Sequence, residues 1–292
     1  MDLSTTMEAA LRGAVVGTGN GLLALALVLT FRSTGVLNLA LGGIASVAAF
    51  VLWDLWAAGD LALIVALPLA VAAAVALALA GEVALRPLRK APVVVKAVAT
   101  LGLLLVIQAG IFVIWGPADQ VLPPLLDGAV AVGDVRIGTQ QIITAAIAVA
   151  AALALGAWSQ RRPLGLASLA VAEDDDAARL LGVRPERVAA AVWGASGILA
   201  GMAGVGLSGG LAVLNATEMT LALVTSLAAA LLAGFDRLGV AVAAAAAVGG
   251  VTAAAASVPG IARTSGMVES LGFLAVLAVV FLRPRAAVPG RA

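Results

Sequence analysis

Nine long apolar runs fill most of this chain and limit what it can fold into. Each run is close to the ~17–25 residues that a helix needs to cross the hydrocarbon core of a bilayer. Within lipid, every backbone N–H and C=O needs a partner in its own segment, so we expect these runs to be helices. They cover residues 9–31, 36–56, 61–85, 93–115, 139–158, 188–207, 219–235, 238–257 and 267–282.

The composition agrees with a lipid environment and excludes several classes of function. Of the 292 residues, 63% are hydrophobic and 11% are charged, whereas ordinary soluble domains are ~25% charged. Cysteine, histidine and tyrosine are absent, which removes disulfides, the commonest metal ligand and the commonest general base. The net charge of +1 gives no argument for nucleic-acid binding. An intramembrane enzyme is therefore not expected.

The sequence predicts an all-α polytopic membrane protein of about eight to ten transmembrane helices, forming a single domain over residues 1–292. The range reflects two irregular runs, because 267–282 is short and 36–56 is interrupted by Gly42 and Gly43. Asp2 and Glu8 precede the first run, unlike the basic start of a cleavable signal peptide, so we expect this run to be retained.

The basic residues predict the orientation, since short cytoplasmic loops are enriched in Lys and Arg. If the N-terminus lies outside, alternation of the spans places fourteen basic residues on the cytoplasmic side and three on the outer side. The cytoplasmic side then holds the loop 159–187 and the C-terminus. The loop 116–138, rich in proline and glycine, is predicted to be an ordered, turn-rich outer loop. The outer basic residues are Arg12, Arg136 and Arg263.

Ionisable residues within the runs all lie near the run ends, where long side chains reach the interface. With no acid near the midplane, a proton-coupled carrier is disfavoured, while sodium coupling through backbone carbonyls stays open. The ionisable residues are Arg12, Asp54, Glu82, Lys96 and Glu269.

Four uncharged polar residues lie deeper in the runs and are candidates for a translocation pathway: Asn20, Asn38, Thr100 and Gln108. Polar side chains are costly in lipid and face a partner helix or a cavity, so interhelical hydrogen bonding and a polar pathway both remain open. Asn38 is the best candidate, because it lies in VLNLALGG, where glycines allow the helix to open. Small residues at fourfold spacing, such as Gly13, Gly17 and Gly21, predict closely packed helices.

A charged segment, 161–187, interrupts the apolar chain with the sequence RRPLGLASLAVAEDDDAARLLGVRPER. Its apolar residues recur at spacings of three, four and seven, which predicts one or two short amphipathic helices. The acids Glu173 to Asp176 suit the start of a second helix, and Gly182 suits its end. A solvated connecting loop is the simpler interpretation, but an exposed apolar stripe favours a protein partner.

Several short motifs together resemble the permease subunits of bacterial ABC importers for branched-chain amino acids, the shorter of the two permease types. LTFRSTGVLNLALGG resembles the family's early TGxxNxAxG stretch at Thr34, Gly35, Asn38, Ala40 and Gly42. EVALRPLRKAPVVVKAVATLGLLLVIQ resembles its RPLR turn and the TxGLxxxxQ helix that contains Thr100 and Gln108. The charged segment resembles the family's coupling loop at Gly165, Ala170, Glu173, Asp174, Ala178, Leu181 and Gly182.

The resemblance implies a set of partners in the bacterial cytoplasmic (inner) membrane. Two cytoplasmic ATP-binding subunits would dock on the coupling loop, a second permease subunit (a homologous chain or a copy) would complete the pathway, and an extracytoplasmic solute-binding protein would deliver the solute. The chain would bind no cofactor and would use ATP only through its partners, in keeping with the absence of a GxxxxGK[ST] phosphate loop.

Departures from the family pattern at Leu41, Leu169 and 233–239 leave the solute open, and related small amino acids, amides or urea are alternatives. The alternative class of function is a secondary carrier or channel for small amphipathic solutes.

Overall fold

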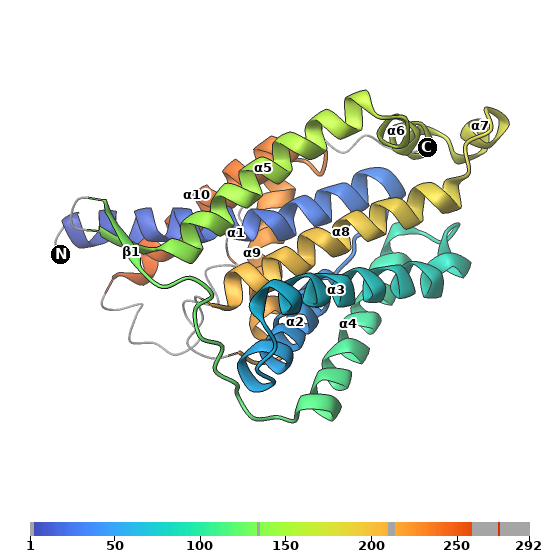
Figure 1. Cartoon of the computed structure of the whole chain (residues 1–292). Coiled ribbons are helices and arrows are strands. Elements are labelled where there is room, and N and C mark those ends of the chain that lie inside the picture. Colours follow the sequence, from blue (N-terminus) through green and yellow to red (C-terminus); the bar gives the residue numbers. More distant parts are fainter. Residues whose placement is uncertain (1–2, 133–134, 210–213, 259–273, 275–292) are drawn as a thin grey trace.

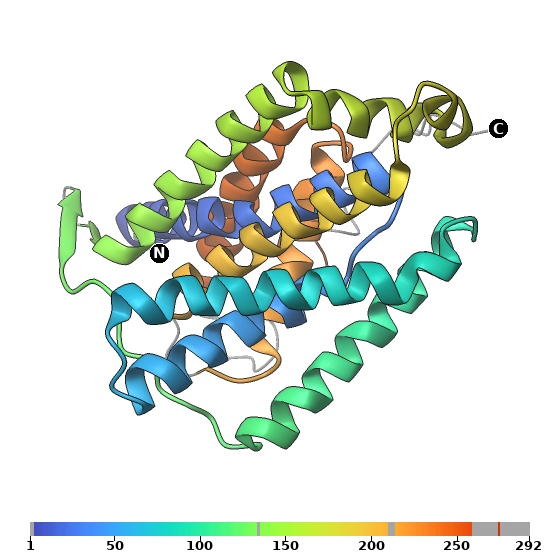
Figure 2. The ribbon, with the colours of Figure 1, turned by 45° about the vertical axis from the view of Figure 1, so that its right-hand side comes forward.

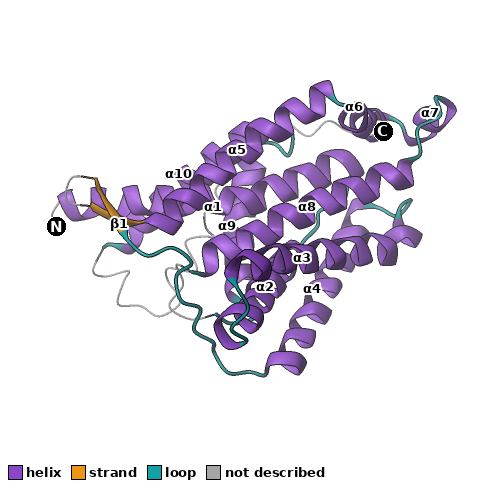
Figure 3. Ribbon diagram, in the orientation of Figure 1, coloured by secondary structure: helices purple, strands orange, loops and turns teal. Residues whose placement is uncertain are grey.

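The computed structural model describes residues 3–132, 135–209, 214–258 and 274, and helices make up most of this part (Figures 1 and 3). Seven of these helices are long and apolar enough to cross a membrane, by length and composition. They are α1 (Leu3–Thr34), α2 (Leu41–Leu52, continued by a π-helical turn, Trp53–Ala58), α3 (Leu63–Leu85, continued by a 3-10 turn, Arg86–Leu88), α4 (Val93–Trp115), α5 (Thr139–Arg161), α8 (Pro185–Ser208) and α10 (Leu238–Ala256).

An eighth apolar helix, α9 (Glu218–Leu232), has only 15 residues. Eight predicted runs therefore correspond to eight helices, and the all-α polytopic membrane fold is confirmed. The ninth run, 267–282, lies outside the described residues apart from position 274. The single-domain organisation over 1–292 stays a prediction.

The long helix α1 lies at the centre of the bundle, with α5, α8, α9 and α10 around it (Figures 1 and 2). Every residue from Leu22 to Leu29 is fully buried. A helix that is apolar on all sides in this way is a core element. The second group of helices, α2, α3 and α4, packs on the other side of α8, where α3 and α2 make the contacts.

Glycines bring the backbones of neighbouring helices into contact, as the small-residue stripes predict. Gly17 of α1 lies against α10, where an added Cβ would meet Gly249 Cα at 2.9 Å. Gly201 of α8 lies against α3, where a Cβ would meet Ala74 Cβ at 3.0 Å. Without water to drive association, such close van der Waals contact holds membrane helices together.

The loop 116–138 contains more regular structure than the sequence indicates. Strands β1 (Ala129–Val132) and β2 (Val135–Gly138) form an antiparallel pair directly before α5. Gln120 also exchanges two backbone hydrogen bonds with Leu214, at 3.0 and 2.7 Å, between α8 and α9. The described part of the loop thus contains regular backbone pairing, and it contacts the chain segment that precedes α9.

Large apolar side chains remain exposed along α3 and α4, among them Ile64, Val94, Val106 and Val113, which is 86% exposed. An exposed apolar surface of this kind needs lipid or a partner subunit to cover it. This face is consistent with the membrane-spanning assignment of both helices.

Gly17→Ala should destabilise the bundle, because its Cβ would press on the backbone of α10. Overpacking of this kind costs about 1–3 kcal/mol. We expect a lower thermal midpoint for the detergent-solubilised protein. Gly110→Ala in α4 is the matched control, since its Cβ would meet nothing within 4 Å. Equal midpoints for the two variants would contradict the close α1–α10 contact.

Candidate functional site

The charged segment folds into two short helices, α6 (Pro163–Glu173) and α7 (Asp175–Leu180), at one end of the bundle (Figure 1). Asp174 separates them and caps α7, because its Oδ1 accepts hydrogen bonds from the backbone N–H groups of Asp176 at 2.9 Å and Ala177 at 3.0 Å. Gly182 follows α7 with a φ of 85°, a conformation that favours glycine. The predicted acid-initiated second helix and its glycine end are both present.

The residues predicted to form the coupling loop divide into buried and exposed groups. Gly165 and Ala178 are buried, and a Cβ on Gly165 would collide with the backbone of Trp158 at the end of α5. Ala170 is partly buried, and Glu173 is exposed. Leu181 is 81% exposed beside Leu180, which is 90% exposed. The buried residues fix the loop to the bundle, and the two leucines form an apolar tip that the described part of the chain leaves uncovered.

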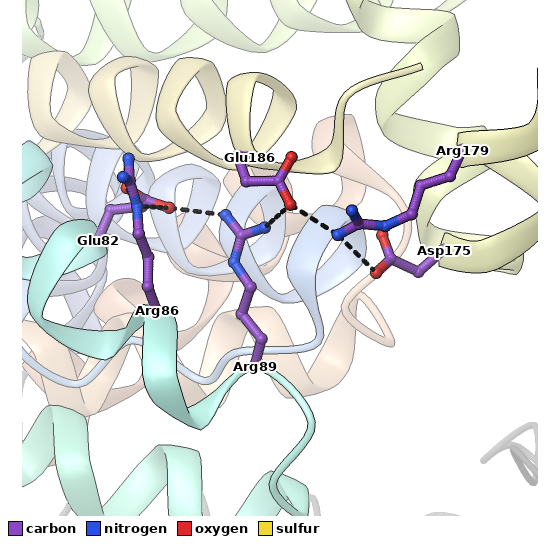
Figure 4. A network of polar contacts seen from close by, with 6 residues as sticks. All are labelled: Glu82, Arg86, Arg89, Asp175, Arg179 and Glu186. Carbon is purple, nitrogen blue, oxygen red and sulfur yellow. Dashed lines mark hydrogen bonds and ion pairs between the residues drawn. The ribbon is translucent and has the colours of Figure 1, made fainter. Parts of the chain in front are cut away.

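A buried carboxylate, Glu82, lies at the end of α3. Its side chain is 3% exposed, and it forms ion pairs of 2.8 Å with both Arg86 and Arg89 (Figure 4). The sequence placed Glu82 near a run end and treated it as able to reach the interface. That interpretation is wrong for the side chain, which is buried and paired with two guanidinium groups of the RPLR turn, as burial of a charge requires.

The ion pairs continue from this turn to the charged loop (Figure 4). Arg89 lies 3.3 Å from Glu186 Oε1 in the first turn of α8, and the same oxygen lies 2.6 Å from Arg179 of α7. Arg179 also lies 3.7 Å from Asp175. The hydrogen bond to Glu186 raises the pKa of the Arg179 guanidinium above its ordinary value. We call the six connected residues the coupling-end ion chain: Glu82, Arg86, Arg89, Asp175, Arg179 and Glu186.

The coupling-end ion chain lies beside a cavity of about 190 Å³ at the same end of the bundle. Its lining includes Glu82, Arg86, Arg89 and Asp175, together with Lys96 of α4. Four charged residues of the coupling-end ion chain therefore line a cavity that is bounded by α1, α3, α4, α6, α7 and α8.

Between α1 and α2 the chain is not helical, so the run 36–56 begins with irregular backbone. The break does not lie at Gly42 and Gly43, where the sequence predicts it, because both glycines belong to the first turn of α2.

Residues 35–40 form an irregular segment, and Asn38 is fully buried within it. Thr100 of α4 holds this segment: its hydroxyl donates to the Leu37 carbonyl at 2.8 Å and accepts from the Leu39 N–H at 3.1 Å. Irregular backbone at membrane depth needs partners of this kind. Asn38 and Thr100 therefore lie close together, because Thr100 forms hydrogen bonds with the residues on either side of Asn38.

The amide of Asn38 is only partly satisfied. Its Oδ1 accepts from the Ala40 N–H at 3.1 Å, whereas its buried Nδ2 has no hydrogen-bond partner in the described part of the chain.

The other two pathway candidates both contact α9. Asn20 Nδ2 donates to Thr225 Oγ1 at 3.4 Å, and Gln108 Nε2 donates to Thr220 Oγ1 at 3.0 Å. The four candidates therefore form two groups, one at the irregular segment and one at α9. Interhelical hydrogen bonding is observed at Asn20 and Gln108, and a role in translocation stays a prediction for all four.

Sequence reasoning missed Glu186, which joins two arginines, and Glu218, which begins α9 just before the run at 219. A signal for Glu218 exists, because Asn215-Ala-Thr-Glu218 is a polar helix start followed by an apolar stretch. Asn215 Oδ1 accepts from the Glu218 N–H at 3.0 Å. No comparable signal exists for Glu186, whose partners lie on other elements of the fold.

Comparison with known proteins decides the family. Residues 9–280 match the sequence model of the family described as "Branched-chain amino acid transport system / permease component". The chain belongs to this family. It is therefore a permease component of a transport system, as the motifs indicate, and a multi-pass membrane protein.

Two relatives and one solved structure extend this result. The chain is 26% identical over 223 residues to the high-affinity branched-chain amino acid transport system permease protein LivH of Escherichia coli (strain K12), and equally to that of Escherichia coli O157:H7, with 70% of each chain covered. Its fold is similar to a chain of PsaBC from Streptococcus pneumoniae in complex with Fab, with a TM-score of 0.52 and 14% identity over 94% of this chain and 91% of that one.

Asp174→Ala should loosen α7 without unfolding the bundle. The substitution removes the N-cap, which costs about 1 kcal/mol, so the amides of 175–181 should exchange with deuterium about fivefold faster. Asp176→Ala is the control, because Asp176 is exposed and accepts no capping hydrogen bond. Unchanged exchange in Asp174→Ala would contradict the capping role.

Thr100→Val should destabilise the 35–40 segment, because it leaves the Leu39 N–H and Leu37 carbonyl without this partner. An unpaired buried polar group costs about 1–3 kcal/mol. Thr100→Ser keeps the hydroxyl and serves as the control. We expect the thermal midpoint to fall in the order wild type, Ser, Val, and a Val variant as stable as the Ser variant would show that the hydroxyl is not needed.

Proposed function

We propose that this chain is the permease subunit of an ATP-driven ABC importer that translocates branched-chain or related small amino acids. Two cytoplasmic ATP-binding subunits supply the energy, so that the chain itself is not an enzyme and holds no cofactor. A second permease subunit, either a homologue or a copy of this chain, completes the pathway, and an extracytoplasmic solute-binding protein delivers the solute.

The apolar tip of α7 is the observation that carries the coupling proposal. Leu180 and Leu181 are almost fully exposed at the C-terminal end of α7, whose N-terminus is capped by Asp174. Exposed apolar groups of this kind mark a protein contact, and a short helix that inserts into a groove is a recurring mode of recognition. The buried Gly165 and the coupling-end ion chain connect this tip to α3, α5 and α8, so displacement of the tip would be transmitted to the bundle.

The same proposal places residues 159–187 and the C-terminus in the cytoplasm and the N-terminus outside, in the bacterial inner membrane. The excess of basic residues on that side supports this orientation. The chain contains no cysteine. A single cysteine introduced in place of Leu180, in membranes without the ATP-binding subunits that would cover it, should react with a membrane-impermeant maleimide in inside-out vesicles and not in intact cells.

The solute class rests on the family and on the name of the LivH relatives. Small amides and urea remain alternatives that uptake measurements distinguish. A secondary carrier or channel is the alternative mechanism, and it requires no ATP.

Leu180→Glu combined with Leu181→Glu should abolish ATP-dependent leucine uptake in vesicles that contain the complete complex. The acidic pair cannot be buried in an apolar groove, and co-purification of the ATP-binding subunits should be lost as well. Leu180→Met with Leu181→Met keeps the apolar tip and should retain most uptake. Uptake by the acidic variant at the wild-type rate, or wild-type uptake driven by an ion gradient without ATP, would refute the proposal.

A further inference from the structure

A mainly apolar cavity between α1, α5, α8 and α9 contains one carboxylate, that of Glu218. The cavity has a volume of about 340 Å³, at the lower end of the roughly 300–1,000 Å³ typical of small-molecule sites. It lies away from the coupling-end ion chain, because its lining comes from the middle of α1, the first two turns of α5, the last turn of α8 and the first half of α9.

Glu218 is the one ionisable residue among the described residues of this lining. Its carboxylate accepts one side-chain hydrogen bond within the described part of the chain, from Asn215 Nδ2 at 3.4 Å, which is longer than an ordinary hydrogen bond. Glu218 is partly buried and lies in the first turn of α9, where the helix dipole favours a carboxylate. The described lining offers no cation, so an ammonium group that enters the cavity would meet a carboxylate without an ion pair among the described residues.

The rest of the lining is neutral and combines hydrogen-bonding groups with aliphatic surface. The amides of Asn20 and Gln141 and the hydroxyl of Thr225 supply hydrogen-bonding groups. One carboxylate, neutral amide donors and aliphatic walls fit a small amino acid that carries an ammonium group, a carboxylate and an apolar side chain. The aliphatic surface comes from Val15, Val16, Leu207, Met219 and Leu221.

The Asn20–Thr225 hydrogen bond lies where this cavity meets a larger one. The second cavity, of about 670 Å³, extends between α1, α9 and α10, and it shares Val16, Asn20, Leu221 and Thr225 with the first. The bond between Asn20 and Thr225 is long, at 3.4 Å. A solute that displaces this bond would pass from one cavity to the other.

We propose that the cavity of Glu218 is a transient binding site for the permeating amino acid, in which the Glu218 carboxylate pairs with the ammonium group of the solute. The Asn20 and Gln141 amides donate to its carboxylate, and the aliphatic wall contacts its side chain. This inference rests on the proposed function for the identity of the solute, and it assigns Glu218 as a specificity-determining residue.

Cysteine protection tests the site directly, because the chain has no cysteine of its own. Ala222→Cys places a thiol in the lining, and Ala253→Cys places one in the larger cavity without touching the first. In membranes that contain the complete complex, leucine at about nine times its dissociation constant should slow modification of the thiol at position 222 by a small methanethiosulfonate about tenfold. It should leave the thiol at position 253 unaffected.

Analogues identify the group that Glu218 recognises. 3-Methylbutylamine, which keeps the ammonium group, should also protect the thiol at position 222, whereas 4-methylpentanoate, which lacks it, should not. Protection by leucine should be lost in Glu218→Gln and partly retained in Glu218→Asp. If Glu218 served only to begin α9 by accepting from Asn215, glutamine would preserve that hydrogen bond. Protection by leucine would then be unchanged in Glu218→Gln.

The outcomes separate this site from the proposed function. Equal protection in Glu218→Gln, protection by 4-methylpentanoate, protection by sodium alone, or an unreactive thiol at position 222 would each overturn the site while ATP-dependent leucine uptake by the wild-type complex continues. If the wild-type complex does not take up leucine with ATP, the proposed function fails instead.

Discussion

Direct contact between the backbones of α1 and α10 sets the position of the other helices in the bundle. Gly13 and Gly17 let α10 approach so closely that a single added methyl group would meet main-chain atoms. α1, which is fully buried from Leu22 to Leu29, lies at the centre, and α5, α8 and α9 pack on the faces that α10 leaves open. Because lipid provides no hydrophobic drive between helices, this shape complementarity replaces it.

The polar side chains that are candidates for solute binding lie near points where regular helices begin or end. The irregular segment 35–40 brings Asn38 to Thr100, and the late start of α9 brings Glu218 beside Asn20 and Gln141. Broken helices free backbone and side-chain polar groups that a continuous helix would satisfy internally. The bundle thus combines a closely packed centre with two polar regions at helix breaks.

Much of the fold follows from the sequence, because run length and composition decide which segments are helices in lipid. Eight runs became helices, and Asp174 and Gly182 mark the ends of α7 through local backbone chemistry that the sequence reports directly. The burial of Glu82 did not follow, since its pairing with Arg89 spans seven residues across a turn and depends on how α3 ends. Likewise, Glu186 and Glu218 acquire their neighbours only when separate helices pack together.

The two ends of the coupling-end ion chain differ in their exposure to solvent. Glu82 at one end is buried between two arginines, whereas Glu186, Arg179 and Asp175 at the other end are each about half exposed. Mobile ions screen exposed charges far more than buried ones. Glu186 Oε1 is also the one atom in this chain of ion pairs that contacts both Arg89 and Arg179. Raised ionic strength therefore weakens the attachment of α7 first and leaves the Glu82 pairs intact, so the salt content of the surrounding solution tunes how firmly α7 is held to the membrane-embedded body.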